Sequence, residues 1–250
     1  MLSEKLQMNQ AIYPRSVSAD GTTSIYFNLQ TYNRGTFVWD VVPTGLTVTS
    51  TGLLYQATDE AGTSAASITA SSTVLYASSN LTEATLTPSI SAGETNATLE
   101  VNGLTFTGMS VGSTATPSSR QFVGSTANVS TTITNLAAAM NDDVYGVPGV
   151  RALAGSAALT MYWDENAKAQ TPIDYDGLAL TSSNTTSMTI GAVHMQGILE
   201  IRDNQLTLSS SFTHVALNVI NVSANYTGAV LIRGGGRYLE PKPSSPITQF

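Results

Sequence analysis

The sequence predicts a mainly β protein: an antiparallel, jelly-roll-like β-sandwich with a small inserted α+β domain that carries one helix. Short runs alternate apolar and polar residues, as strands with one buried face do. Clusters of Gly, Asn, Asp and Ser separate these runs and indicate turns. Only one stretch has the apolar spacing of a convincing amphipathic helix.

The two ends of the chain are expected to close into one sandwich. Gln196–Tyr238 has the pattern of four short strands with an apolar face, and such a face needs a partner layer. Residues 20–76 are expected to supply that layer. The predicted boundaries are an N-terminal arm at 1–11, a discontinuous sandwich domain at 12–90 and 195–238, an inserted domain at 91–194 and an extended tail at 239–250.

The N-terminal part supplies the first predicted layer. Met1–Gln10 is interpreted as a weak helical turn or an arm, and Pro14 ends any helix there. Thr36–Val42 is mostly apolar on both faces, which favours a central strand. Ser78–Gly93 has little pattern and is interpreted as a linker. Strands are expected at Ser24–Gln30, Thr36–Val42, Leu46–Thr49, Leu53–Gln56 and Ser67–Tyr76.

The middle of the chain predicts a hairpin, a helix and further strands. Thr98–Val101 and Leu104–Thr107 flank an Asn-Gly pair, which is the strongest short hairpin signal. Thr131–Asn141 has apolar residues at helical spacing, with Ser130 as its expected N-cap. Strands are expected at Val150–Leu153, Ala158–Trp163, Leu178–Leu180 and Met188–Val193, and then at Ile198–Ile201, Leu206–Leu208, Val215–Ile220 and Val230–Ile232.

Composition excludes several classes of function. The net charge is −7 and only 11% of the 250 residues are charged, so the chain has no basic footprint for nucleic acid or anionic membranes. It has no cysteine, hence no disulfide and no thiolate ligand. The N-terminus lacks a signal-peptide core, so synthesis in the cytosol without export by the ordinary route is expected.

No catalytic constellation is found, and we predict no enzyme activity, cofactor or metal site. His194 and His214 are interpreted as surface or half-buried strand residues, with too few other ligands nearby. Asp174–Gly177 begins like a calcium loop but lacks the later acidic ligands, so a turn is expected. The acidic pairs at 142–143 and 164–165 are adjacent, so in a strand their side chains point apart.

Interface residues are predicted near the C-terminus. Arg233 and Arg237 flank three glycines without phosphate-loop spacing, and they are candidates for pairing with acidic groups of a neighbouring subunit. Tyr238 precedes a proline-rich tail ending at Phe250. That tail is interpreted as a frayed end or as an arm laid across a partner. The predicted interface set is Arg233, Arg237, Tyr238 and Phe250.

Three segments resemble small structural proteins of tailed bacteriophages. They are LYQATDEAGT at 54–63, FTHV at 212–215, and VLIR at 230–233 with Arg-Tyr at 237–238. The resemblance covers residues 12–76 and 196–238 and implies an acidic β-sandwich of the virion head. Separately, ATLEVNGLTFT at 97–107 with TITNLAAAMN at 132–141 resembles a hairpin-plus-helix module of phage head, tail and fibre proteins.

The resemblance implies a capsid decoration or cement protein of the virion. Its partners would be the major capsid protein and further copies of itself, as a trimer or dimer, with no nucleic acid and no membrane. The alternative is a tail or fibre component that binds host-surface carbohydrate, for which Tyr162, Trp163 and Tyr175 are candidate aromatic contacts.

Overall fold

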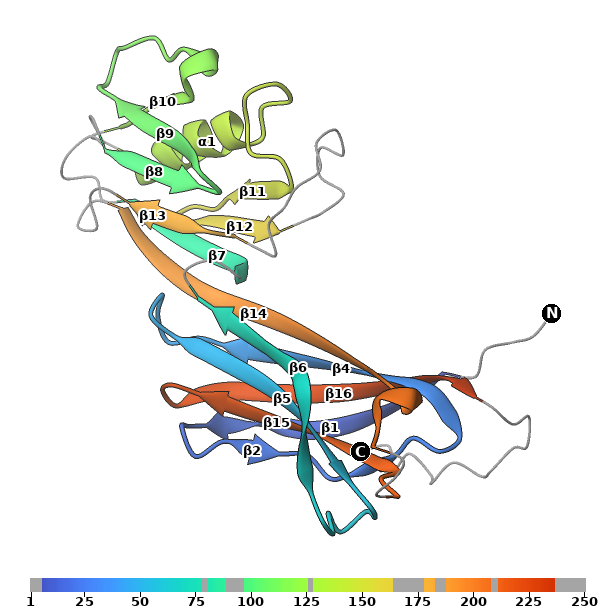
Figure 1. Ribbon diagram of the computed structural model, residues 1–250. Helices are drawn as coiled ribbons and strands as arrows, with labels where there is room; N and C mark the ends of the chain where they lie inside the picture. The colour runs from blue at the N-terminus through green and yellow to red at the C-terminus, as the bar shows by residue number, and fades with distance from the viewer. Residues whose placement is uncertain are drawn as a thin grey trace.

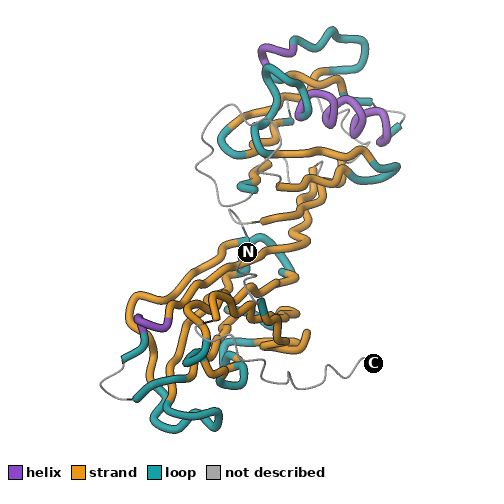
Figure 2. Tube along the Cα trace, turned by 90° about the vertical axis from the view of Figure 1, so that its right-hand side faces the viewer, coloured by secondary structure: helices purple, strands orange, loops and turns teal. Residues whose placement is uncertain are grey.

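The computed structural model describes residues 6–77, 81–88, 97–125, 128–163, 178–182, 188–207 and 211–236. The protein is mainly β: 58% of the described residues lie in strands, and the same part of the chain contains a single α-helix. The predicted fold class is therefore confirmed. Figures 1 and 2 show two lobes, a lower sandwich and a distal lobe that carries the helix.

The sandwich has two layers that pair strands from both ends of the chain. Its first layer is part of a seven-stranded sheet of order β1-β16-β4-β14-β7-β12-β11. Its second layer has the order β2-β15-β5-β6, with β3 also paired to β15. The bounds of the strands of the first layer are β1 Gln7–Val17, β16 Asn225–Gly236, β4 Tyr32–Val42 and β14 Met188–Arg202. Those of the second layer are β2 Thr22–Thr23, β3 Phe27–Asn28, β15 His214–Asn221, β5 Thr49–Ala57 and β6 Ala66–Tyr76.

The distal lobe packs helix α1 against short strands. It contains a four-stranded sheet of order β10-β9-β8-β13 and the outer strands of the seven-stranded sheet. Strand β14 joins the lobes, because its first half pairs with β7 and its second half with β4. The bounds are β7 Leu81–Pro88, β8 Thr98–Val101, β9 Leu104–Met109, β10 Gln121–Val123, α1 Val129–Met140, β11 Val150–Ala154, β12 Leu159–Trp163 and β13 Leu180–Ser182; short 3-10 turns lie at Pro117–Ser119 and Asp203–Gln205.

Large apolar side chains fill the space between the two layers of the sandwich. Phe37 and Trp39 of β4 are fully buried, as are Leu217 of β15 and Leu231 of β16. Interdigitation of inward-facing residues from both sheets is the expected packing of a sandwich.

Two predictions at the start of the chain need correction. The predicted arm is wrong from Gln7 onward, because β1 begins there and pairs with β16. Pro14 lies inside this strand, which is tolerated because β1 is the edge of its sheet and its register shifts between Gln10 and Arg15. The continuous strand expected at Ser24–Gln30 is instead the two-residue β3, preceded by β2.

Other local predictions also need correction. The linker is wrong over Leu81–Pro88, because β7 lies there and is hydrogen-bonded to both β12 and β14. The N-cap of α1 is Asn128 rather than Ser130, since the Asn128 Oδ1 accepts a hydrogen bond from the Ser130 N–H at 3.0 Å. A 3-10 turn at Asp203–Gln205 precedes Leu206, where the sequence predicted a strand; position 208 lies outside the described residues.

Candidate functional site

The segments that carry the phage resemblance meet at one end of the sandwich. The Thr213 N–H donates to the Ala57 carbonyl at 3.1 Å, and the Thr213 hydroxyl donates to the Thr58 carbonyl at 3.2 Å. Gln56 exchanges two hydrogen bonds with Thr207. Segments about 150 residues apart in the sequence are thereby held side by side.

The loop between β5 and β6 is fixed by its own hydrogen bonds. The Asp59 Oδ1 accepts a hydrogen bond from the Thr63 N–H at 2.9 Å. Hydrogen bonding from the Thr63 side chain, and next from its backbone, lowers the pKa of the Asp59 carboxyl. Gly62 has a φ of +82° and lies against the Tyr26 ring, so a Cβ there would come within 2.6 Å of the ring. The loop is thus held against the segment before β3.

A pocket of about 560 Å³ opens between β1 and β3 at this end of the sandwich. Asn9, His214 and Arg233 supply polar groups to its lining, while Ile25 and Phe27 supply apolar walls. The complete lining is Leu6, Gln7, Met8, Asn9, Ile25, Tyr26, Phe27, Asn28, Glu60, His214 and Arg233. Burial lowers the pKa of His214, a shift that the nearby Asp59 and Glu60 partly oppose, so the imidazole is neutral at neutral pH.

Among the predicted interface residues, the structure describes only Arg233; Arg237, Tyr238 and Phe250 lie outside the described residues. The Arg233 side chain lies between the two layers and is 9% exposed. It donates hydrogen bonds to its own chain, to the Asn28 carbonyl and to the side-chain oxygens of Gln7 and Asn9. No sequence pattern indicates these partners, which lie more than 200 residues away along the chain.

The outward side of the first layer exposes several apolar side chains, and we call it the outer face. We define it by the outward residues of β1, β16, β4 and the second half of β14. Pairing places Val230, Val38 and Ile198 in one row across three strands. Met8 and Tyr226 are 67% exposed and Ile198 is 58% exposed. The apolar members of the outer face are Met8, Val38, Val42, Ile198, Tyr226, Val230 and Ile232.

Charged and polar residues lie among the apolar ones on the outer face. Arg34 and Arg202 are paired in register at one end, where Arg202 also contacts Glu200 at 3.2 Å. Asp40 lies between Val38 and Val42 along β4, where its Oδ1 accepts a hydrogen bond from the Gln196 Nε2 at 2.9 Å and is 3.7 Å from the His194 Nε2. The apolar row of Val230, Val38 and Ile198 is therefore bordered by polar rows, and such a mixture of apolar and polar groups is usual at protein–protein interfaces.

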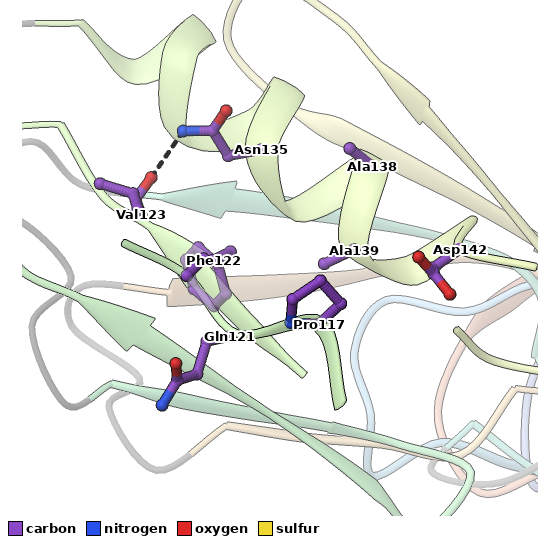
Figure 3. A pocket seen from close by; sticks show the side chains of 9 residues that line it. Pro117, Gln121, Phe122, Val123, Asn135, Ala138, Ala139 and Asp142 are labelled. Carbon is purple, nitrogen blue, oxygen red and sulfur yellow. Dashed lines mark hydrogen bonds between the residues drawn. The ribbon is translucent and has the colours of Figure 1, made fainter. Parts of the chain in front are cut away.

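A second pocket, of about 290 Å³, lies beside α1 in the distal lobe (Figure 3). Polar side chains that line this pocket form hydrogen bonds with the backbone of the distal lobe. Asn135 donates to the Val123 carbonyl at 2.8 Å, and the Asp142 Oδ1 accepts hydrogen bonds from the N–H groups of Val144 and Tyr145. We therefore assign this pocket to the packing of α1 on β10.

The remaining chemical candidates stay dispersed. Within the described ranges, no three His, Asp or Glu residues gather into a metal-binding group. Tyr162 and Trp163 lie half-buried on β12, and Trp163 packs against the core. Residues 164–165 and 174–177, including Tyr175, lie outside the described residues. No described helix has the length and hydropathy needed to cross a bilayer.

No protein-family model, curated protein or solved structure matches this chain. The relation to phage structural proteins therefore stays a prediction based on the segments quoted above.

Proposed function

We propose that the protein is a structural component of a bacteriophage particle, a decoration protein that attaches to the assembled head through its outer face. The observation that carries this proposal is the set of exposed apolar side chains that four strands of one sheet present on the same side, among them Met8, Ile198 and Tyr226. Apolar side chains gathered on one face and bordered by polar groups are typical of surfaces that contact another protein. A second sheet or a flat protein surface would bury that face as the second layer already buries the inner one.

The two-lobed shape supports the same proposal. The outer face belongs to the sandwich, whereas the distal lobe extends away from it on β14 and β7 (Figures 1 and 2). The sandwich would thus bind the shell while the lobe projects from it. A protein that binds only the assembled shell stabilises that state by mass action and needs no catalytic group.

Stable binding would require burial on the scale of ordinary protein interfaces, roughly 800 Å² on each partner. Ile198 lies on β14 at one side of the outer face, in the same row as Val38 and Val230, and its side chain is 58% exposed. Its replacement by aspartate therefore introduces a charge into the expected contact without disturbing the sandwich core.

The test uses undecorated heads of the phage that encodes the chain. The wild-type protein should co-sediment with the heads and raise the temperature at which they open. Ile198→Asp should lose co-sedimentation, whereas Val144→Asp, a matched change at a residue of the distal lobe that is 77% exposed, should retain it. Unchanged thermal unfolding of both variants would show that each is folded.

Three outcomes would contradict the proposal. The wild-type protein could remain in the supernatant, the two variants could bind equally, or the protein could be missing from purified particles analysed by mass spectrometry. Retention on host polysaccharide in place of heads would favour the tail or fibre alternative. Sedimentation of the protein without heads reports whether the outer face is instead occupied by another copy.

A further inference from the structure

Arg233 is a buried cation that only neutral oxygens surround. Its Nη1 donates to the Asn28 carbonyl at 2.8 Å, and its Nη2 donates to the Gln7 Oε1 at 3.0 Å and the Asn9 Oδ1 at 2.8 Å. The Tyr32 ring lies 4.6 Å from the guanidinium carbon. The Nε–H is buried and has no hydrogen-bond partner among the described residues.

The guanidinium lacks a counter-ion within the described part of the chain, where no carboxylate forms an ion pair with it. Burial correspondingly lowers the pKa of Arg233. Taking a charge out of water is costly, and buried charges are normally paired. Hydrogen bonds to neutral oxygens and the contact with the Tyr32 ring offset part of that cost. The positive charge itself is not balanced by a negative charge among the described residues.

Arg233 lines the pocket of about 560 Å³ between β1 and β3 at the end of the sandwich. The small part of the Arg233 side chain that remains exposed therefore faces this pocket. Ile25 and Phe27 provide apolar walls beside it. Glu60 is exposed and lines the same pocket together with His214. Arg233 attracts an anionic group to its part of the pocket, whereas the Glu60 carboxylate opposes the accumulation of further negative charge there.

We propose that Arg233 anchors a binding site for one carboxylate carried on an apolar body. An Asp or Glu side chain between apolar residues of a partner segment and a free organic monoacid present the same chemistry. The carboxylate would accept charge-assisted hydrogen bonds from the guanidinium, and the apolar body would cover Ile25 and Phe27. Because the pocket lies within one chain, failure of head binding would leave this site intact.

The first test follows the Arg233 Nε–Hε signal by ¹⁵N NMR of the full chain, with the signal assigned by its loss in Arg233→Lys. Acetyl-Leu-Glu-Leu-amide and hexanoate should each shift the signal in a saturable way. Their neutral counterparts, acetyl-Leu-Gln-Leu-amide and hexanamide, should leave it in place. Tighter binding of the peptide identifies a partner segment as the source of the carboxylate, and tighter binding of hexanoate identifies a free acid.

The second test supplies the missing carboxylate from within the chain. Asn9→Asp is nearly isosteric and places a carboxylate oxygen where the Asn9 Oδ1 now lies, 2.8 Å from the Arg233 Nη2. The variant should unfold at a higher temperature and bind the probes at least about tenfold more weakly, since the charge is already compensated. Asn128→Asp, the same change of charge at the N-cap of α1, should bind the probes as the wild type does.

Three results would overturn the assignment. One is the absence of a saturable shift with either carboxylate probe. Another is that the neutral probes or inorganic phosphate shift the Arg233 signal as much as the carboxylate probes do. The third is that Asn9→Asp binds the carboxylate probes as tightly as the wild type does. The folded Asn9→Asp variant keeps the test decisive if Arg233→Lys fails to fold.

Discussion

Replacing Gly197 by alanine should destabilise the sandwich, because the Trp39 indole occupies the space where a Cβ would lie. Gly197 of β14 pairs in register with Trp39 of β4. A Cβ at position 197 would lie 2.2 Å from the Trp39 Cζ2, more than 1 Å inside the 3.4 Å at which ordinary contact begins. The indole meets Gly52 of the opposite layer as well, where an added Cβ would lie 2.7 Å from its Cη2.

The size of the effect follows from the confinement of the indole. Trp39 is fully buried, so its indole can make room for the added Cβ only if the opposite sheet moves or the side chain leaves its preferred rotamer. Overpacking of a core costs roughly 1–3 kcal/mol, and alanine regains about 0.5–1 kcal/mol over glycine in a strand. Subtracting this gain from the upper end of the range, we expect Gly197→Ala to cost about 2–2.5 kcal/mol and the less crowded Gly52→Ala about 1–2 kcal/mol.

Urea unfolding followed by far-UV circular dichroism measures the loss. Gly45→Ala is the matched control, because a Cβ there meets nothing within 4 Å, and it should unfold as the wild type does. In a Trp39→Phe background the smaller ring should remove most of the cost of Gly197→Ala, which a double-mutant cycle quantifies. The packing described for Trp39 would be refuted if Gly197→Ala were as stable as the wild type. It would also be refuted if Gly197→Ala cost as much stability in the Trp39→Phe background as in the wild type.

Three further predictions concern single contacts. Asn128→Ala should destabilise the protein by about 1 kcal/mol in thermal unfolding, because the Ser130 N–H loses its cap, whereas Asn128→Ser should keep most of the stability. Asn141→Ala should cost about 1–3 kcal/mol, since the Asn141 side chain donates to the Ala152 carbonyl and accepts from the Ala152 N–H; unchanged stability would rule out that contribution. Burial lowers the pKa of His214, so below about pH 6.5 the unfolded chain binds a proton more readily than the folded chain does and stability falls as the pH drops. Urea midpoints at pH 7.5 and 5.5 should therefore differ less in His214→Gln than in the wild type, and equal differences would contradict this.

The elements that the sequence predicted well are those with local causes. The Asn-Gly pair at 102–103 forms the expected two-residue hairpin loop, with φ of +49° and +75°. The helix is present because its apolar spacing needs only a docking surface, and Leu136 and Met140 are buried against it. The strands around Thr36–Val42 and Val215–Ile220 carry alternating side chains that specify an extended conformation.

The errors arose where the outcome depends on distant residues. Leu81–Pro88 has too weak a pattern to predict a strand, and it becomes one because β12 and β14 offer hydrogen bonds on both sides. Pro14 predicts only the end of any helix, and the edge position of β1 lets a strand continue through it. The pairing of Arg233 with a neighbouring subunit stays a prediction, whereas its hydrogen bonds to Asn28 and Gln7 join residues of its own chain that no local pattern indicates.

The sequence alone determined the β class, the turns, the helix and the scarcity of ionisable groups, because composition and short-range periodicity encode them directly. Tertiary structure decided which strands are neighbours, and therefore which apolar faces remain uncovered. It also placed the neutral oxygens of Gln7 and Asn9 around Arg233. The physical reason is that strand pairing joins residues far apart in the chain, and no local pattern specifies the partner that each strand will meet.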